Sequence, residues 1–126
     1  MLRSELINKI IQRKEKLNIT IENIAKLSNL GIRTVNRFFA GEDVKLSTIE
    51  YITNLLGVDF AGNETVPLKK LRQNRAKEKA IFMASLVQST SALEMQGLEK
   101  NSLEKMIHKF EKEFLTGSYK DRLWIA

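Results

Sequence analysis

Four polar side chains that could bind an anionic partner fall within five consecutive positions of this chain: Arg33, Thr34, Asn36 and Arg37. A guanidinium group can donate two parallel hydrogen bonds to a phosphate or to guanine, and a carboxamide pairs in a similar way with adenine. A threonine hydroxyl can bind a phosphate oxygen. These residue types suit recognition rather than bond-breaking chemistry, provided that one element holds all of them on its outer face.

The apolar residues around this group predict two short helices joined by a tight turn. Thr20 can cap the first helix, and Ala25 is small enough for a second helix to pass close to it. Asn29 tolerates the left-handed backbone that a sharp reversal requires, and Gly31 opens the second helix. Two helices crossing steeply in this way make a helix-turn-helix, whose second helix presents its N-terminal half to the major groove of DNA.

The flanking residues predict the rest of a small helical bundle. Before this pair of helices, apolar residues at three- and four-residue steps predict another helix over residues 3–17. Ser47 and Glu50 form a capping-box pattern at the start of a fourth helix, which we expect to end at Gly57. Residues 1–60 are therefore predicted to be one domain.

The second half of the chain predicts a separate helical region. Residues 61–67 read as a linker, and residues 68–126 as a pair of long helices broken at Gly97. Apolar residues gather at 81–95 and again at 103–115, which makes stripes too wide for two helices to bury on each other alone. We expect a helical hairpin that pairs with a second copy. Trp124 is interpreted as an anchor on the core rather than an exposed hook.

Composition and charge narrow the class of protein. The chain has 126 residues, a net charge of +6, one proline, six glycines and no cysteine. So few turn residues disfavour a sheet-rich fold, and with the helical patterns they predict an all-α protein. The absence of cysteine excludes disulfides and thiolate metal sites. No apolar run is long enough to span a bilayer, and no secretory signal is recognised at the N-terminus. We expect a cytoplasmic protein whose partner is nucleic acid rather than membrane.

Residues 3–60 resemble the phage Cro and repressor proteins, also called the Xre family of helix-turn-helix regulators. The resemblance runs without a gap from Ile19 to Gly41 and continues through "LSTIEYITNLLGVDF", which looks like the family's fourth and fifth helices. It implies an N-terminal five-helix Cro/repressor-like bundle. Ile21 stands where the family often has a glutamine that meets a phosphate, and Gly31 stands where it has serine or threonine.

The same resemblance implies which residues meet DNA. The base-reading positions are Ile32, Arg33, Asn36 and Arg37, of which Ile32 could touch a thymine methyl group but cannot hydrogen-bond. The residues better placed for the phosphate backbone are Thr20, Thr34 and Lys45. With Ile21, these make up the predicted DNA-binding set.

Other kinds of chemistry have little support in the sequence. His108 is the only histidine, and Glu111 and Glu113 lie on different faces of one helix, which makes them a poor catalytic pair. No Ser–His–acid arrangement or phosphate-binding loop stands out. We therefore expect no enzymatic activity, no metal and no cofactor.

The predicted function is a sequence-specific DNA-binding transcriptional regulator, a repressor that reads a pseudo-palindromic site as a dimer. Two alternatives stay open: an antitoxin whose C-terminal helices hold a toxin, and a helical protein-interaction module without DNA binding. The basic run Lys69–Lys79 has two interpretations, an arm that crosses a phosphate backbone or simply the exposed start of a helix.

Overall fold

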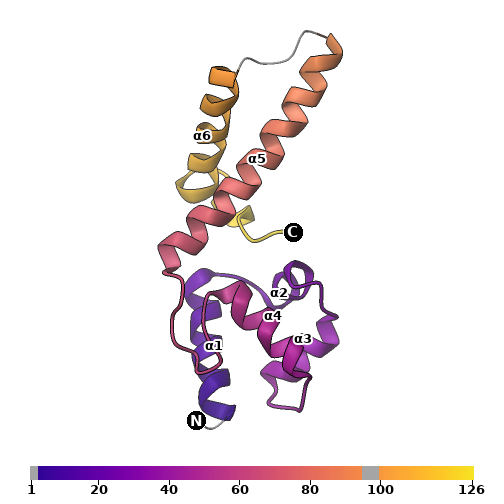
Figure 1. Cartoon of the computed structure of the whole chain (residues 1–126), viewed down its shortest axis with the longest axis vertical. Helices are drawn as coiled ribbons and strands as arrows, with labels where there is room; N and C mark the ends of the chain where they lie inside the picture. The colour runs from indigo at the N-terminus through magenta and orange to yellow at the C-terminus, as the bar shows by residue number, and fades with distance from the viewer. Residues whose placement is uncertain (1–2, 95–99) are drawn as a thin grey trace. The chain divides into compact units, whose positions relative to one another are not determined.

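The computed structural model describes residues 3–94 and 100–126, and within them the chain is all-helical, as predicted (Figure 1). The side chains of residues 89–94 and 100 are not part of this description. The helices are α1 (Arg3–Leu17), α2 (Ile21–Leu27), α3 (Ile32–Phe39), α4 (Leu46–Leu56), α5 (Leu68–Glu94), α6 (Lys100–Thr116) and the 3-10 helix η1 (Lys120–Arg122). The chain divides into two compact units, residues 1–71 with 125–126, and residues 72–124.

The core of the first unit is built from the inward faces of α1 to α4. Every helix contributes at least two apolar side chains that are almost completely buried, because each has apolar residues at three- or four-residue steps. Burial of one isoleucine, leucine, valine or phenylalanine side chain contributes about 1.5–3 kcal/mol. These residues are Ile7, Ile10 and Leu17 of α1, Ile24 and Ala25 of α2, Val35 and Phe38 of α3, and Ile52 and Leu56 of α4.

Helix α4 starts earlier than its predicted cap. It begins at Leu46, its N-cap is Lys45, and no side chain caps its first turn, so the predicted capping box of Ser47 and Glu50 is wrong. Ser47 instead occupies the second helical position. The far end agrees with the prediction, since Gly57 adopts φ +69° in the left-handed region, which an L side chain rarely adopts.

Four helices lie between Arg3 and Phe60 where five were predicted. After Gly57 the chain forms a turn instead of a fifth helix, because the Asp59 carboxylate accepts hydrogen bonds from the backbone N–H groups of Ala61 and Asn63, both at 2.9 Å. The same stretch closes with an isolated bridge between Val58 and Glu64. These local bonds compete with helical hydrogen bonding.

Residues 61–67, predicted to be a linker, are held on the first unit by the buried Arg13 side chain. Its Nε donates to the carbonyl of Leu56 at 2.8 Å, and its other nitrogens donate to the carbonyl of Val66 and pair with Glu64. The division between the two units accordingly falls after Leu71, within the first turn of α5. The predicted boundary lay several residues earlier.

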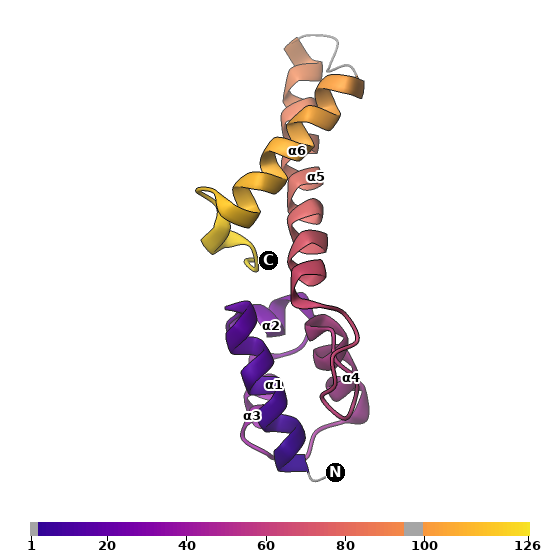
Figure 2. The same cartoon turned by 90° about the vertical axis from the view of Figure 1, so that its left-hand side faces the viewer.

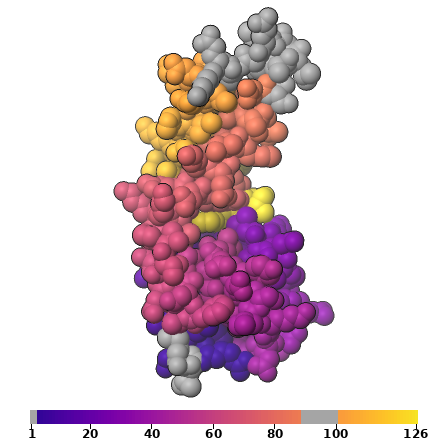
Figure 3. Space-filling view, viewed as in Figure 1, coloured from indigo at the N-terminus to yellow at the C-terminus, as the bar shows by residue number. Residues whose placement is uncertain are grey.

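In the second unit, α5 and α6 run in opposite directions (Figures 1 and 2). The α5 side chains Ala76, Ala80 and Ala84 are buried at four-residue steps, and small residues let another helix come close. The side chains of α5 and α6 lie against each other in the space-filling view (Figure 3). Phe114 and Trp124 are also buried, as expected for Trp124.

Some sequence-based expectations lie outside the described residues: the break at Gly97, Met95, and the Leu93 side chain of the 81–95 stripe. Among the described residues, none of the helices combines the length and apolar character needed to cross a bilayer.

Candidate nucleic-acid interface

Helices α2 and α3 are joined by the tight turn that the sequence predicted. Asn29 adopts φ +56° there, and the backbone N–H of Leu30 donates to the carbonyl of Ala25 at 2.9 Å. Ala25 is 4% exposed, and α2 and α3 are in contact with each other. The turn fixes the direction in which α3 leaves α2, and therefore which face of α3 points outward.

The outward face of α3 carries four of the predicted DNA-binding residues: Ile32, Arg33, Asn36 and Arg37, all exposed. Because consecutive helical residues are about 100° apart, these four positions share one arc of about 140°. Val35 and Phe38 on the opposite side are 0% and 2% exposed, and they hold the helix against the core. Because Val35 and Phe38 fix the inner side of α3, its outer side exposes two guanidinium groups, a carboxamide and one branched apolar side chain to solvent.

Arg37 also bonds within its own unit. Its Nη2 donates to the backbone carbonyl of Asp43 at 3.4 Å, and its Nε lies 4.0 Å from Oε1 of Glu42. Both side chains of the ion pair are more than half exposed, so the pair adds little stability. The contacts instead restrict where the guanidinium group points.

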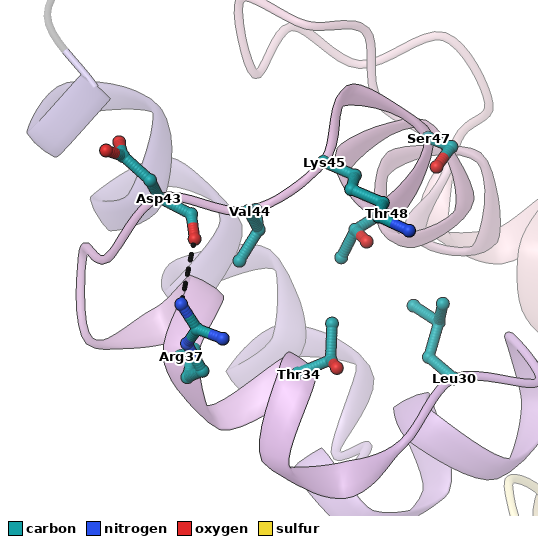
Figure 4. A pocket seen from close by; sticks show the side chains of 8 residues that line it. All are labelled: Leu30, Thr34, Arg37, Asp43, Val44, Lys45, Ser47 and Thr48. Atoms are coloured by element: carbon teal, nitrogen blue, oxygen red, sulfur yellow. Dashed lines mark hydrogen bonds between the residues drawn. The ribbon is translucent and has the colours of Figure 1, made fainter.

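An open pocket of about 660 Å³ lies between α3 and the start of α4 (Figure 4). The Thr34 and Arg37 side chains line it from α3, and Lys45 lines it from the N-cap of α4. Helix N-termini carry free N–H groups and a partial positive charge, which favour anions. The complete lining is Leu30, Thr34, Arg37, Asp43, Val44, Lys45, Ser47 and Thr48.

The pocket brings together three of the eight predicted residues: Thr34, Arg37 and Lys45. Thr20 and Ile21 lie instead at the start of α2 and do not line it. The exposed Thr20 caps α2, since its hydroxyl oxygen accepts a hydrogen bond from the backbone N–H of Asn23 at 3.1 Å. That bond leaves the hydroxyl hydrogen of Thr20 for another acceptor. Ile21 is half-buried.

Sequence reasoning did not assign Ser47 and Thr48 to this site. Both hydroxyl-bearing side chains face the pocket (Figure 4), although Thr48 is only 4% exposed. They were missed because Ser47 was assigned to the cap of α4. Adjacent serine and threonine residues at a helix start are the only signal that could have found them.

The basic run Lys69–Lys79 is divided by the fold. Arg75 donates from its Nε to the carbonyl of Leu123 at 2.9 Å, and the Lys79 Nζ lies 5.8 Å from the centre of the Phe114 ring. Burial, and secondarily the charge of Arg75, lower the pKa of Lys79. Lys69, Lys70 and Lys77 remain exposed. The run is therefore partly structural, and three of its cations point to solvent.

No group of three or more acidic, histidine or cysteine side chains that could hold a metal ion occurs in the described part of the chain. No protein-family model, curated protein or solved structure matches this sequence. The features of this chain that bear on function are the geometry of α2, α3 and the start of α4.

Proposed function

We propose that this protein is a sequence-specific DNA-binding transcriptional regulator of the Cro/repressor type, in which α2 and α3 form the helix-turn-helix. In this arrangement the N-terminal half of α3 lies in the major groove. The composition of the outward face of α3 is the main support for this proposal. It combines Arg33, Asn36 and Arg37 on a helix whose opposite side is fully buried.

Those side chains match the chemistry of base edges. Each arginine can bind guanine O6 and N7, and Asn36 can bind adenine N6 and N7, with two hydrogen bonds in either case. The net charge of +6 favours approach to a polyanion. Arg37 approaches DNA in a direction limited by its contacts with Glu42 and the Asp43 carbonyl.

The pocket between α3 and α4 supplies contacts to the sugar-phosphate backbone. Lys45 brings a cation, and Thr34 and Ser47 bring hydroxyl groups, to the pocket beside the first turn of α4, which no side chain caps. Such contacts position a protein on DNA without reading sequence. Thr20, at the start of α2, offers a hydroxyl to another phosphate.

A second copy of the chain completes the proposed regulator. A pseudo-palindromic site needs two reading helices about 34 Å apart, which a dimer provides. In the second unit, Phe82 and Leu86 lie one helical turn apart on α5 and are 61% and 50% exposed. We assign this face of a helical hairpin to the dimer contact. The dimer would repress by occupying a promoter.

Selection from random duplex DNA by the purified protein tests the proposal. We expect an enriched site with two-fold symmetry that the Arg33→Ala/Arg37→Ala variant no longer selects. Lys105→Ala/Lys109→Ala is the matched control, because it removes two exposed cations from α6 and should leave the selected site unchanged. Equal, salt-sensitive binding of all sequences by every variant would reduce the interaction to backbone electrostatics and contradict the proposal.

The alternative of an antitoxin rests on the same exposed face of α5. If that face binds a toxin, the protein should co-purify from its source with one second protein in a fixed ratio, and the isolated chain should be a monomer. If the protein is instead a helical interaction module without a DNA role, the selection from random duplex DNA should enrich no sequence.

A further inference from the structure

We infer that a pocket between α1 and the end of α3 binds a small aryl carboxylate, and that this ligand weakens DNA binding through Asp43. The pocket belongs to the first unit and shares no lining residue with the outward face of α3 that is proposed to meet DNA. The effect on DNA rests on the proposed function, whereas binding of the carboxylate does not.

The pocket has the size and the apolar surface that a small organic molecule needs. Its volume is about 460 Å³, within the range of about 300–1,000 Å³ that is typical of ligand pockets. Ile7 lines it from α1 and is 7% exposed, and Phe39 lines it from α3 and is half-buried. The pocket therefore offers a branched apolar side chain and an aromatic ring, which suit an aryl group.

Polar side chains of α1 give the pocket its preference for a carboxylate. Arg3, Ser4 and Asn8 line it together with Ile7, since these four positions share one arc of about 140° on the helix. The Arg3 guanidinium group can donate two parallel hydrogen bonds to a carboxylate. The Ser4 hydroxyl and the Asn8 carboxamide add further donors. No acidic side chain is among the described residues that line the pocket.

The opposite wall limits the ligand to one negative charge. Ala40 and Gly41 line the pocket where α3 ends at Phe39, and the carboxyl end of a helix carries a partial negative charge. A second carboxylate on the ligand would lie against that charge. We therefore expect a monocarboxylate whose aryl group lies toward α3 and whose charge lies at Arg3.

The present partner of Arg3 can be replaced by such a ligand. The Arg3 guanidinium group pairs with the Asp43 carboxylate, and their side chains are 56% and 95% exposed. Water screens an ion pair this exposed, so the pair contributes little. A ligand carboxylate offers Arg3 the same charge and adds apolar contact with Ile7 and Phe39, which the Asp43 side chain does not line.

Asp43 connects this exchange to α3. Its carboxylate pairs with Arg3, while its backbone carbonyl accepts a hydrogen bond from Arg37 Nη2 at 3.4 Å. Figure 4 shows this bond, with the Asp43 carboxylate pointing away from Arg37. Release of the carboxylate from Arg3 loosens the Asp43 backbone and, with it, the direction in which Arg37 points. Ligand and DNA then weaken each other's binding by the same factor. Because an exposed ion pair limits that factor, it is about two- to fivefold.

Titration of the purified protein with phenylacetate, followed by ¹H–¹⁵N NMR, tests the site. Phenylacetate should shift the amide signals of residues 4–8 and 39–41 with a dissociation constant of about 1–10 mM. Phenylacetamide, which has the same shape without the charge, should bind much more weakly. Arg3→Ala should lose this preference. Lys16→Ala is the matched control, because it removes an exposed cation from the other end of α1 and should keep the preference.

Fluorescence anisotropy with the selected DNA site tests the effect on DNA binding. Saturating sodium phenylacetate should raise the dissociation constant for DNA about two- to fivefold, relative to sodium chloride at the same ionic strength. Asp43→Asn weakens the pair with Arg3 without any ligand. This variant should therefore bind DNA more weakly in sodium chloride, and phenylacetate should change its affinity little.

The outcomes separate this inference from the proposed function. If phenylacetate and phenylacetamide shift the same amide signals equally, or if neither shifts them, the inferred site is wrong and DNA recognition stands. If phenylacetate binds but leaves the affinity of the wild-type protein for DNA unchanged, the connection through Asp43 is wrong. If no DNA site is selected, the proposed function fails and the effect on DNA fails with it, while the NMR titration still decides whether the pocket binds a carboxylate.

Discussion

The Nε atom of Arg13, in the middle of α1, lies 2.8 Å from the carbonyl oxygen of Leu56, the last residue of α4. The same guanidinium group donates to the carbonyl of Val66 and pairs with Glu64. Arg13 is only 7% exposed, yet acceptors from three separate places surround its charge. A buried charge is tolerated when it is paired and hydrogen-bonded in this way. This one side chain therefore joins two helices and the segment that leads to α5.

Replacement of Arg13 by alanine should strongly destabilise the first unit. It removes the donor from two backbone carbonyls in a crowded site, and losing one partner of a buried polar network costs about 3 kcal/mol. Urea denaturation followed by circular dichroism gives the free energy of unfolding. Glu64→Gln is the control, because Glu64 is 49% exposed and its loss should cost less than about 1 kcal/mol. Equal losses for the two variants would contradict this account of Arg13.

Enlargement of Ala25 should disturb the crossing of α2 and α3. Ala25 is 4% exposed, so the added atoms of Ala25→Leu have no free space, and overpacking of this kind costs about 1–3 kcal/mol. Ala40→Leu is the matched control, because Ala40 is exposed at the end of α3. Thermal melts should show a lower Tm for Ala25→Leu and almost none of that shift for Ala40→Leu. A wild-type Tm for Ala25→Leu would disprove the close crossing.

The turn between α2 and α3 should prefer glycine to alanine at position 29. Asn29 has φ +56°, which costs alanine about 1 kcal/mol and costs glycine almost nothing. Asn29→Gly should therefore unfold at the same urea concentration as the wild type or higher, and Asn29→Ala at a lower one. Asn18, with φ +58° after α1, should show the same order. A more stable alanine variant at either position would exclude a left-handed conformation there.

A charge on the exposed face of α5 should separate the proposed dimer. Phe82 is 61% exposed, so Phe82→Glu should leave the fold of one chain intact and introduce like charges across the contact. Sedimentation should give twice the chain mass of 14.5 kDa for the wild type and 14.5 kDa for the variant. Lys77→Glu, at an exposed position earlier in α5, should remain dimeric. A wild-type protein that is monomeric at micromolar concentration would rule out this dimer.

Ser118 should control the titration of Glu113 at the end of α6. Hydrogen bonds from the Ser118 hydroxyl at 2.6 Å and its backbone N–H at 3.1 Å lower the pKa of Glu113 below 4.5. Since the pKa is lower in the folded state, the stabilisation is complete at neutral pH and is lost as the pH falls through the folded pKa. An NMR titration should show a higher Glu113 pKa in Ser118→Ala. Thr116→Ala, whose hydroxyl bonds to the Lys112 carbonyl, should leave that pKa unchanged.

Structural features that depend on a few neighbouring residues, such as helix bounds and tight turns, could be predicted from the sequence. The apolar spacing placed α1 at residues 3–17, as observed, and Gly57 ended α4 at its predicted position. The turn at Asn29 was predicted from the tolerance of asparagine for the left-handed region. In each case the cause lies within one or two helical turns of chain, where spacing and backbone preference act directly. The exposed residues of α3 followed from the same periodicity.

Other features required the folded chain. The start of α4 differs from the capping pattern because Lys45 takes the N-cap position, which turns Ser47 and Thr48 toward the pocket beside α3. The expected fifth helix was replaced by a turn around Asp59. Capping and turn patterns are weak preferences of a fraction of a kcal/mol to about 2 kcal/mol, and tertiary packing overrides them.

The sequence by itself therefore determined an all-helical chain, the tight turn before α3 and the outward set of Arg33, Asn36 and Arg37, because these depend on local spacing. Only the tertiary structure decided which basic side chains hold the fold together by hydrogen bonds and which remain exposed to solvent. Arg13 meets acceptors 43, 51 and 53 residues away, and Arg75 meets a carbonyl 48 residues away. An arginine on a helix looks solvent-exposed in a sequence. Folding brings distant carbonyl groups to it, and those groups compensate for the loss of water around its charge.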